Sequence, residues 1–207
     1  MCADYRNLSD EVTNLDNSGI DMFHIDVMDG SFVPNFACGP ETVKCVRSLT
    51  KKPVEVHLMI KDPAKHIKLF ADLGADIIYI HAEADLQITR TLEKIKELGC
   101  SAGLAINPGT SAAAVKELLP LCSHVLVMTV NPGFAGQKFL EFTTNKIREF
   151  GLLSSPCGFT LCVDGAISPE KIKELHTLGV NGFVLGTSAL FNKNRPYSDI
   201  ICELKRI

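Results

Sequence analysis

Two histidines and two aspartates stand inside short apolar runs of this chain. His24 and Asp26 lie in Met-Phe-His-Ile-Asp-Val-Met, His57 lies in Val-Glu-Val-His-Leu-Met-Ile, and Asp164 ends Thr-Leu-Cys-Val-Asp. Such runs predict buried strands, where an unpaired polar group costs on the order of 1–3 kcal/mol. Four such side chains would satisfy one another by holding one divalent metal ion. Imidazole and carboxylate ligands favour Zn²⁺, Fe²⁺, Mn²⁺ or Co²⁺ over Ca²⁺ or Mg²⁺.

The two aspartates add a second chemical possibility at the same place. Two carboxyl groups in opposite protonation states can remove a proton from one face of a carbon atom and return one to the other face. Asp26 and Asp164 therefore predict proton transfer beside a carbonyl group. The alternative for each polar residue alone is a hydrogen-bonded core position. For His81, in His-Ala-Glu-Ala, that alternative and a supporting role beside the site are equally open.

Three glycine-bearing segments follow strand-like runs and together predict a site for a phosphate group. They are Val130-Asn-Pro-Gly133-Phe134-Ala135-Gly136-Gln137, Asp164-Gly165-Ala166 and Leu185-Gly186-Thr187-Ser188-Ala189. Loops of small residues let backbone N–H groups point at an anion. Each segment alone is common in turns between a strand and a helix, so the prediction depends on all three.

Strand-like and helix-like segments alternate along the chain. Strands are expected at residues 22–28, 54–60, 77–81, 102–106, 124–130, 159–163 and 182–185. Amphipathic helices are expected at residues 9–18, 40–49, 63–73, 86–98, 111–119, 140–152, 169–178 and 197–205. Asp62 and Ser168, each followed by proline, predict helix N-caps. Strands that are apolar throughout are typical of a parallel sheet covered on both faces.

Two architectures fit this alternation, an open doubly wound sheet and a (β/α)₈ TIM barrel. The polar residues that lie late in the strands favour the barrel, because its strand ends share one mouth. They are His24, Asp26, His57, His81, Asn107, Asn131, Asp164 and Thr187. We therefore expect an α/β barrel formed by a single domain, residues 1–207. A first strand is missing before Ala3, so either the start is truncated or the barrel is open at that point.

Composition narrows the class of protein. The chain has 207 residues, 46% of them hydrophobic, and a net charge of −3 without a basic run, which argues against a nucleic-acid partner. No apolar stretch approaches the roughly 20 residues that span a bilayer, and the N-terminus lacks the pattern of a secretion signal. Eight cysteines without a C-x-x-C pair favour reduced thiols. We expect a cytoplasmic protein with neither a nucleic-acid nor a membrane partner.

Four motifs together resemble the ribulose-phosphate 3-epimerase family. They are His24-Ile-Asp-Val-Met-Asp-Gly-Ser-Phe-Val-Pro-Asn35, Val56-His-Leu-Met59, Val127-Met-Thr-Val-Asn-Pro-Gly-Phe-Ala-Gly-Gln137 and Val163-Asp-Gly165. The likeness covers nearly the whole chain in the right order, and the first and third motifs are highly specific. It implies a (β/α)₈ barrel that uses one divalent metal ion to epimerise phosphorylated ketoses at the carbon next to the ketone.

The resemblance assigns roles to individual residues. It implies metal ligands at His24, Asp26, His57 and Asp164, with Asp26 as proton acceptor and Asp164 as proton donor. It implies substrate contacts at His57, Gly133, Phe134, Ala135, Gly136, Asp164, Gly165, Ala166, Gly186, Thr187 and Ser188. The substrate would be a sugar phosphate, with D-ribulose 5-phosphate converted to D-xylulose 5-phosphate in the pentose phosphate pathway. We also expect a homo-oligomer.

The chain departs from the family pattern at three places. The family begins with a strand that ends in a Pro-Ser-Ile/Leu-Leu motif whose Ser touches substrate, and Met1 stands where that end would fall. Asp164-Gly165-Ala166 replaces Asp-Gly-Gly, and Gly186-Thr187-Ser188 replaces Gly-Ser.

Several alternative functions are open at this point. The Gly-Thr-Ser and Met-Thr-Val forms also resemble the D-allulose-6-phosphate 3-epimerase branch, which gives D-fructose 6-phosphate. A metal-dependent hydrolase or lyase and a non-catalytic phosphosugar-binding barrel are more distant alternatives, because fold alone does not fix function.

Overall fold

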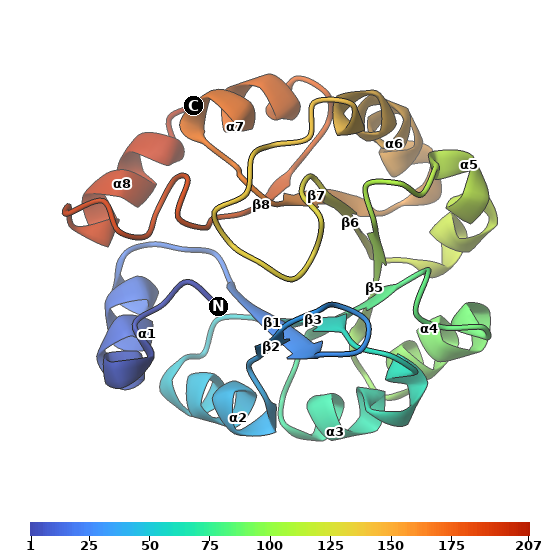
Figure 1. Ribbon diagram of the computed structural model, residues 1–207, viewed down its shortest axis with the longest axis horizontal. Coiled ribbons are helices and arrows are strands. Elements are labelled where there is room, and N and C mark those ends of the chain that lie inside the picture. The colour runs from blue at the N-terminus through green and yellow to red at the C-terminus, as the bar shows by residue number, and fades with distance from the viewer.

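Seven parallel strands form a curled sheet with helices on its outer side (Figure 1). The computed structural model describes residues 1–207. The parallel strands are β1 (Phe23–Asp29), β3 (Val54–Met59), β4 (Ile77–His81), β5 (Ser101–Ile106), β6 (His124–Met128), β7 (Thr160–Asp164) and β8 (Gly182–Val184). All seven strands predicted from the sequence are present, whereas the short antiparallel strand β2 (Phe36–Ala37), paired with the end of β1, was not predicted.

Eight α-helices are present, as the sequence predicted; α1 precedes β1, and each of the other seven follows a strand. They are α1 (Leu8–Asn17), α2 (Pro40–Leu49), α3 (Ile67–Asp72), α4 (Ile88–Glu97), α5 (Ala112–Val115), α6 (Thr143–Cys157), α7 (Pro169–His176) and α8 (Tyr197–Leu204). Single 3₁₀ segments at Tyr5–Asn7, Pro63–Lys65 and Lys116–Leu121 adjoin α1, α3 and α5. None of these helices is both long and apolar enough to cross a lipid bilayer.

The sheet is a barrel that is open on one side. Its strand order is β2-β1-β3-β4-β5-β6-β7-β8, and β1 does not pair with β8. The N-terminus lies on the open side of the curled sheet, near α1 and β1 (Figure 1). The fold is therefore of the predicted TIM-barrel type, and the barrel is open between β1 and β8.

The central parallel strands, such as β3 and β4, are buried on both faces, which explains the unbroken apolar runs in the sequence, whereas β8 at the open edge is half-buried. Outward-facing side chains such as Val56, Leu58 and Ile80 belong to the large core between sheet and helices. A smaller cluster of six residues, including Tyr79 and Leu126, fills the interior of the barrel. Polar residues on the inward face therefore have few partners except one another.

Helix ends confirm one predicted cap and correct another. Ser168 caps α7, because its side chain accepts a hydrogen bond from the backbone N–H of Lys171. Asp62 does not cap a helix; it has a left-handed backbone with φ 50° and forms an ion pair with Lys65 at 3.0 Å. Helix α6 also begins and ends later than predicted, and its end at Gly158 is explained by the positive φ of 74° that glycine adopts easily.

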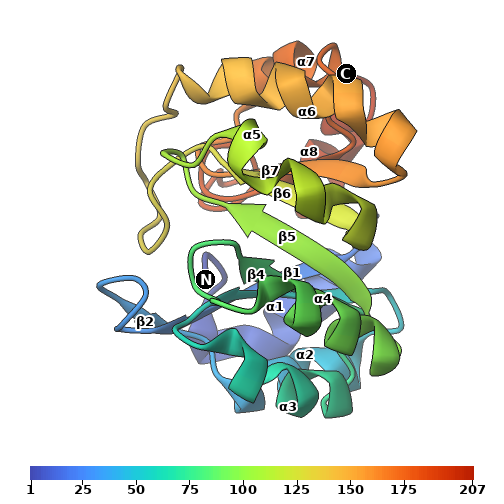
Figure 2. The ribbon, with the colours of Figure 1, turned by 90° about the vertical axis from the view of Figure 1, so that its right-hand side faces the viewer.

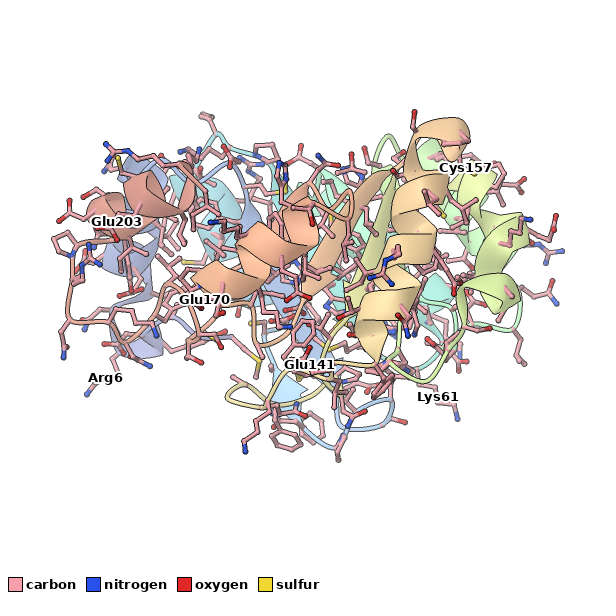
Figure 3. The ribbon with its side chains drawn as sticks, turned by 90° about the horizontal axis from the view of Figure 1, so that it is seen from above. Arg6, Lys61, Glu141, Cys157, Glu170 and Glu203 are labelled. Carbon is pink, nitrogen blue, oxygen red and sulfur yellow. The ribbon has the colours of Figure 1, made fainter.

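Two long loops project from the same end of the barrel. They are the β1–β2 connection and the β6–α6 connection (Figure 2). Lys61, just after β3, and Glu141, just before α6, lie toward that end, while Cys157 at the end of α6 lies at the other (Figure 3). This end is the mouth formed by the carboxyl ends of the strands, where barrel enzymes place their sites.

Candidate active site

The register of β1 against β3 places the polar side chains of the two strands beside one another. His24 is opposite Glu55, and Asp26 is opposite His57. Because residues two apart on a strand point to the same face, all four project into the barrel. The His24 Nε2 and His57 Nδ1 atoms each lie 3.2 Å from Asp26 Oδ1.

Asp164 completes this cluster from β7. Its Oδ2 atom lies 3.9 Å from His57 Nδ1. One ligand atom from each of His24, Asp26, His57 and Asp164 can be chosen so that all four lie within 4.8 Å of one another. Two imidazole nitrogens and two carboxylate oxygens converging in a buried place suit a divalent transition metal ion. The structure thus brings together all four residues that the sequence predicted as ligands.

Glu55 is a member of this arrangement that the sequence analysis missed. It is 5% exposed, and its Oε1 atom lies 2.6 Å from His24 Nδ1. A carboxylate in this position fixes the orientation of a histidine whose other nitrogen faces a metal. The signal was present in the sequence, because Glu55 is a charged residue in an apolar strand two positions before His57.

The two aspartates of the cluster have opposite electrostatic environments. Burial opposes ionisation of Asp26, but the His24 imidazolium and hydrogen bonds from His24 and His57 hold the pKa of Asp26 well below its usual range. Burial and the neighbouring Asp26 carboxylate raise the pKa of Asp164 to about 6. Burial likewise opposes the charged form of His24, yet Glu55 and Asp26 raise the pKa of His24 well above its usual value. An ionised carboxylate therefore stands beside a carboxyl group that retains its proton more readily.

His81, whose role the sequence left open, lies directly against this cluster. Its Nε2 atom is 2.8 Å from His57 Nε2, and both rings are fully buried. Burial lowers the pKa of His81 to about 4, despite the nearby Glu83 carboxylate, so the ring is neutral at pH 7. The other side of the ring, Nδ1, lies 3.4 Å from Glu83 Oε2.

A cavity of about 430 Å³ opens at the mouth and extends along the gap between β1 and β8. Every residue that the family resemblance assigned to the metal or the substrate lines this cavity except His57, which is fully buried. The N-terminal residues also border it: the Met1 nitrogen lies 3.8 Å from Asp26 Oδ2. The structure therefore gathers the acid pair and the glycine-bearing loops around one space.

Backbone geometry explains the glycines of two of these loops. Gly133 and Gly165 have φ of 120° and 116°, and a Cβ at Gly165 would lie 2.5 Å from Val130 Cγ2. Thr129, which the sequence analysis did not single out, fixes the turn after β7 because its backbone N–H donates to Asp164 O at 2.7 Å. The Thr129 hydroxyl donates to the same oxygen at 2.9 Å. The turn that presents Asp164 is thus anchored to the neighbouring strand.

Fold and site together are those of a barrel enzyme with a buried His/Asp cluster that could hold a metal ion at the carboxyl mouth. Residues 1–191 match the ribulose-phosphate 3 epimerase family. The chain is 42% identical over 196 residues to ribulose-phosphate 3-epimerase of Synechocystis sp., covering 93% of this chain and 85% of the relative. It is 39% identical over 198 residues to the Bacillus subtilis enzyme of that name, covering 94% and 91%. The chain therefore belongs to the ribulose-phosphate 3-epimerase family.

Solved structures support the fold independently. The 3-keto-L-gulonate-6-phosphate decarboxylase of Vibrio cholerae superposes with a TM-score of 0.73 at 17% identity, covering 99% of this chain and 93% of the other. A 3-hexulose-6-phosphate synthase superposes with a TM-score of 0.69 at 14% identity, covering 96% and 92%. At these identities the likeness establishes the barrel architecture alone.

Proposed function

We propose that this chain is a metal-dependent epimerase that inverts carbon 3 of a ketose phosphate, interconverting D-ribulose 5-phosphate and D-xylulose 5-phosphate. The observation that carries the proposal is the pairing of Asp26 and Asp164, which approach the same nitrogen atom and have opposite pKa shifts. Membership of an epimerase family supports the class of reaction, which is an isomerisation that inverts one carbon atom of a carbohydrate.

His24, Asp26, His57 and Asp164 would hold the metal ion. A divalent cation bound there supplies positive charge against the negative charge that develops on substrate oxygen atoms when a carbon-bound proton is removed. Zn²⁺, Fe²⁺, Mn²⁺ and Co²⁺ all suit this ligand set. Glu55 supports the proposal because it orients His24 toward the cluster.

The proton transfer itself is assigned to the two aspartates. Asp26, whose ionised form is favoured, accepts the proton from carbon 3 on one face of the sugar. Asp164, whose protonated form is favoured, donates a proton to the opposite face. Two carboxyl groups on opposite faces are needed because a single group would return the proton to the side from which it came. In the reverse reaction the two residues exchange roles.

The phosphate group is assigned to the glycine-bearing loops. Residues of the 133–136, 165–166 and 186–188 segments line the cavity, and small residues there would let backbone N–H groups approach an anion closely. Catalytic carboxyl groups at one side and phosphate donors at the other would orient a short phosphosugar across the mouth.

The test is epimerisation in deuterated solvent, with D-ribulose 5-phosphate and D-allulose 6-phosphate assayed side by side. We expect deuterium at carbon 3 and formation of D-xylulose 5-phosphate, with the six-carbon phosphate turned over more slowly. Release of fragments would instead indicate a lyase or hydrolase. Binding without deuterium exchange would indicate a phosphosugar-binding protein.

Two further expectations belong to this proposal. The first is a homo-oligomer. Phe36 of β2 and Phe134 of the β6–α6 loop are 78% and 51% exposed, and a subunit contact would cover this apolar surface. A cytosolic location is the other, and all eight cysteines are free thiols in the structure, as a reducing compartment requires.

A further inference from the structure

A chain of buried hydrogen-bonding groups leads away from the candidate metal site through His57. His57 Nδ1 faces Asp26 and Asp164, while His57 Nε2 lies 2.8 Å from His81 Nε2. His81 Nδ1 then lies 3.4 Å from Glu83 Oε2. Both imidazole rings are fully buried, so no water molecule can replace either partner without rearrangement.

Glu83, at the far end of this series of hydrogen bonds, is held by a neighbouring loop. Glu83 Oε1 accepts hydrogen bonds from the Asn107 backbone N–H at 3.0 Å and from the Thr110 hydroxyl. The loop that supplies these donors is itself fixed, because Lys146 of α6 donates to the carbonyl oxygens of Asn107 and Pro108 at 2.8 and 2.7 Å. Glu83 is therefore a fixed carboxylate rather than a mobile surface group.

This arrangement permits one assignment of protons when His57 serves as a ligand. A neutral imidazole carries a single N–H, and the ligand nitrogen must be free of it. With Nδ1 of His57 as the ligand atom, Nε2–H donates to Nε2 of His81. The single proton of His81 then lies on Nδ1, from which it donates to Glu83.

We propose that His81 and Glu83 are positioning residues that fix the ring orientation and the tautomer of His57 for metal binding. This inference rests on the metal site of the proposed function. His24 differs, because its partner Glu55 accepts directly without an intervening ring. Partners of metal-binding histidines in other proteins change metal affinity by about 10–100-fold when they are removed.

The experiment measures Zn²⁺ affinity of the purified protein by competition with a chromogenic chelator, together with the visible absorption of the Co²⁺-loaded protein. His81→Leu removes the acceptor for His57, and His81→Gln restores it, since the amide oxygen accepts and the amide N–H₂ donates. Thr91→Val is the control, because Thr91 is also buried, but it lies on α4 and its hydroxyl donates to Asp85, away from the cluster.

We expect His81→Leu to weaken Zn²⁺ binding about 10–100-fold and to change the Co²⁺ spectrum. His81→Gln should bind within a few-fold of the unmodified protein, Glu83→Gln should bind several-fold more weakly, and Thr91→Val should be unchanged. The double variant His81→Leu/Glu83→Gln should bind no more weakly than His81→Leu, because the two residues act in series.

The outcomes separate this inference from the proposed function. An unmodified protein that binds no Zn²⁺ would overturn the metal site itself. An unmodified protein that binds Zn²⁺ while all variants bind equally well would overturn only the positioning role. Additive losses in the double variant would also overturn it. If His81→Leu does not fold, the Zn²⁺ affinity of Glu83→Gln is the test. An affinity equal to that of the unmodified protein would contradict the proposal.

Discussion

Asp26 and Asp164 direct carboxylate oxygens at the same atom, His57 Nδ1, from 3.2 and 3.9 Å. Asp26 belongs to β1 and Asp164 to β7, and four strands separate them in the sheet. In a flat sheet these residues would be far apart, since neighbouring strands are about 4.8 Å apart. The curl of the barrel brings them together, and the resulting acid pair makes the proposed reaction testable by single substitutions.

Removing the ionisable group from either aspartate should abolish turnover. Asp26→Asn and Asp164→Asn are nearly isosteric, so we expect each variant to fold and to lose at least about 10²–10⁴-fold in kcat, the usual contribution of a general acid or base. The measurement is carbon-3 deuterium exchange on D-ribulose 5-phosphate, with circular dichroism to verify folding. Asp62→Asn is the control, because Asp62 is an exposed loop residue that asparagine can replace in the same left-handed conformation. Activity near that of the control in either variant would remove these residues from the mechanism.

Metal uptake should weaken as the pH falls, in two steps. The pKa of His24 lies well above its usual value because of Glu55 and Asp26, so at neutral pH metal binding must displace a proton from His24. This gives about a tenfold loss of affinity per unit of decreasing pH. Below about pH 6 Asp164 is also protonated in the metal-free protein, which adds a second proton and steepens the slope.

The measurement is Zn²⁺ affinity as a function of pH between roughly pH 5 and pH 8, a range that includes the pKa of Asp164. Asp164→Asn should bind more weakly throughout and should lose only the additional slope below about pH 6. A constant slope through that pH in the unmodified protein would contradict the raised pKa of Asp164.

The two mouth loops should depend on each other for order. The Asn35 side-chain amide donates to the carbonyl oxygen of Gly133 at 2.7 Å, across 98 residues of sequence. Removing this bond in Asn35→Ala should cost about 1 kcal/mol, or about fivefold in the population of ordered loops. Hydrogen exchange of residues 131–137 should accelerate, and KM should rise more than kcat falls. Asn145→Ala, on the exposed side of α6, should change neither quantity.

A side chain added beside the proposed phosphate site should weaken substrate binding without unfolding the barrel. A Cβ at Gly186 would approach only the Cys2 Sγ atom, at 3.7 Å, so the fold has room for Gly186→Val. Hydrogen bonds to charged groups contribute about 1.5–3 kcal/mol, so the loss of one phosphate contact should raise KM on the order of tenfold to hundredfold. Gly39→Val, with no atom within 4 Å of its Cβ position, is the control. Equal KM values for the two variants would place the phosphate elsewhere.

Strand and helix positions were predictable because the signals are local. Apolar runs bounded by glycine and polar turns marked all seven parallel strands, and Ser168-Pro169 marked the start of α7. The errors were local as well. Strand β2 has only two residues, too few for a periodic pattern, and Asp62 resembled an N-cap although its left-handed backbone turns its side chain to Lys65.

The four proposed ligands were recognisable for an energetic reason. A charged or imidazole side chain in an apolar strand must find a polar partner, so His24, Asp26, His57 and Asp164 were conspicuous in sequence. Glu55 satisfied the same criterion and was overlooked. Asn35 and Thr129 could not be recognised in this way, because their partners are carbonyl oxygens that any residue provides.

The sequence by itself determined which segments are strands and which polar residues must be paired inside the protein. Only the tertiary structure decided which residues pair. Asp26 and Asp164 meet at His57, and hydrogen bonds join His57 to His81 and His81 to Glu83. The tertiary structure also decided that β1 and β8 do not pair. The reason is physical. Burial of each residue follows from its neighbours along the chain, whereas pairing depends on the curvature and register of the sheet, which arise from contacts distant in sequence.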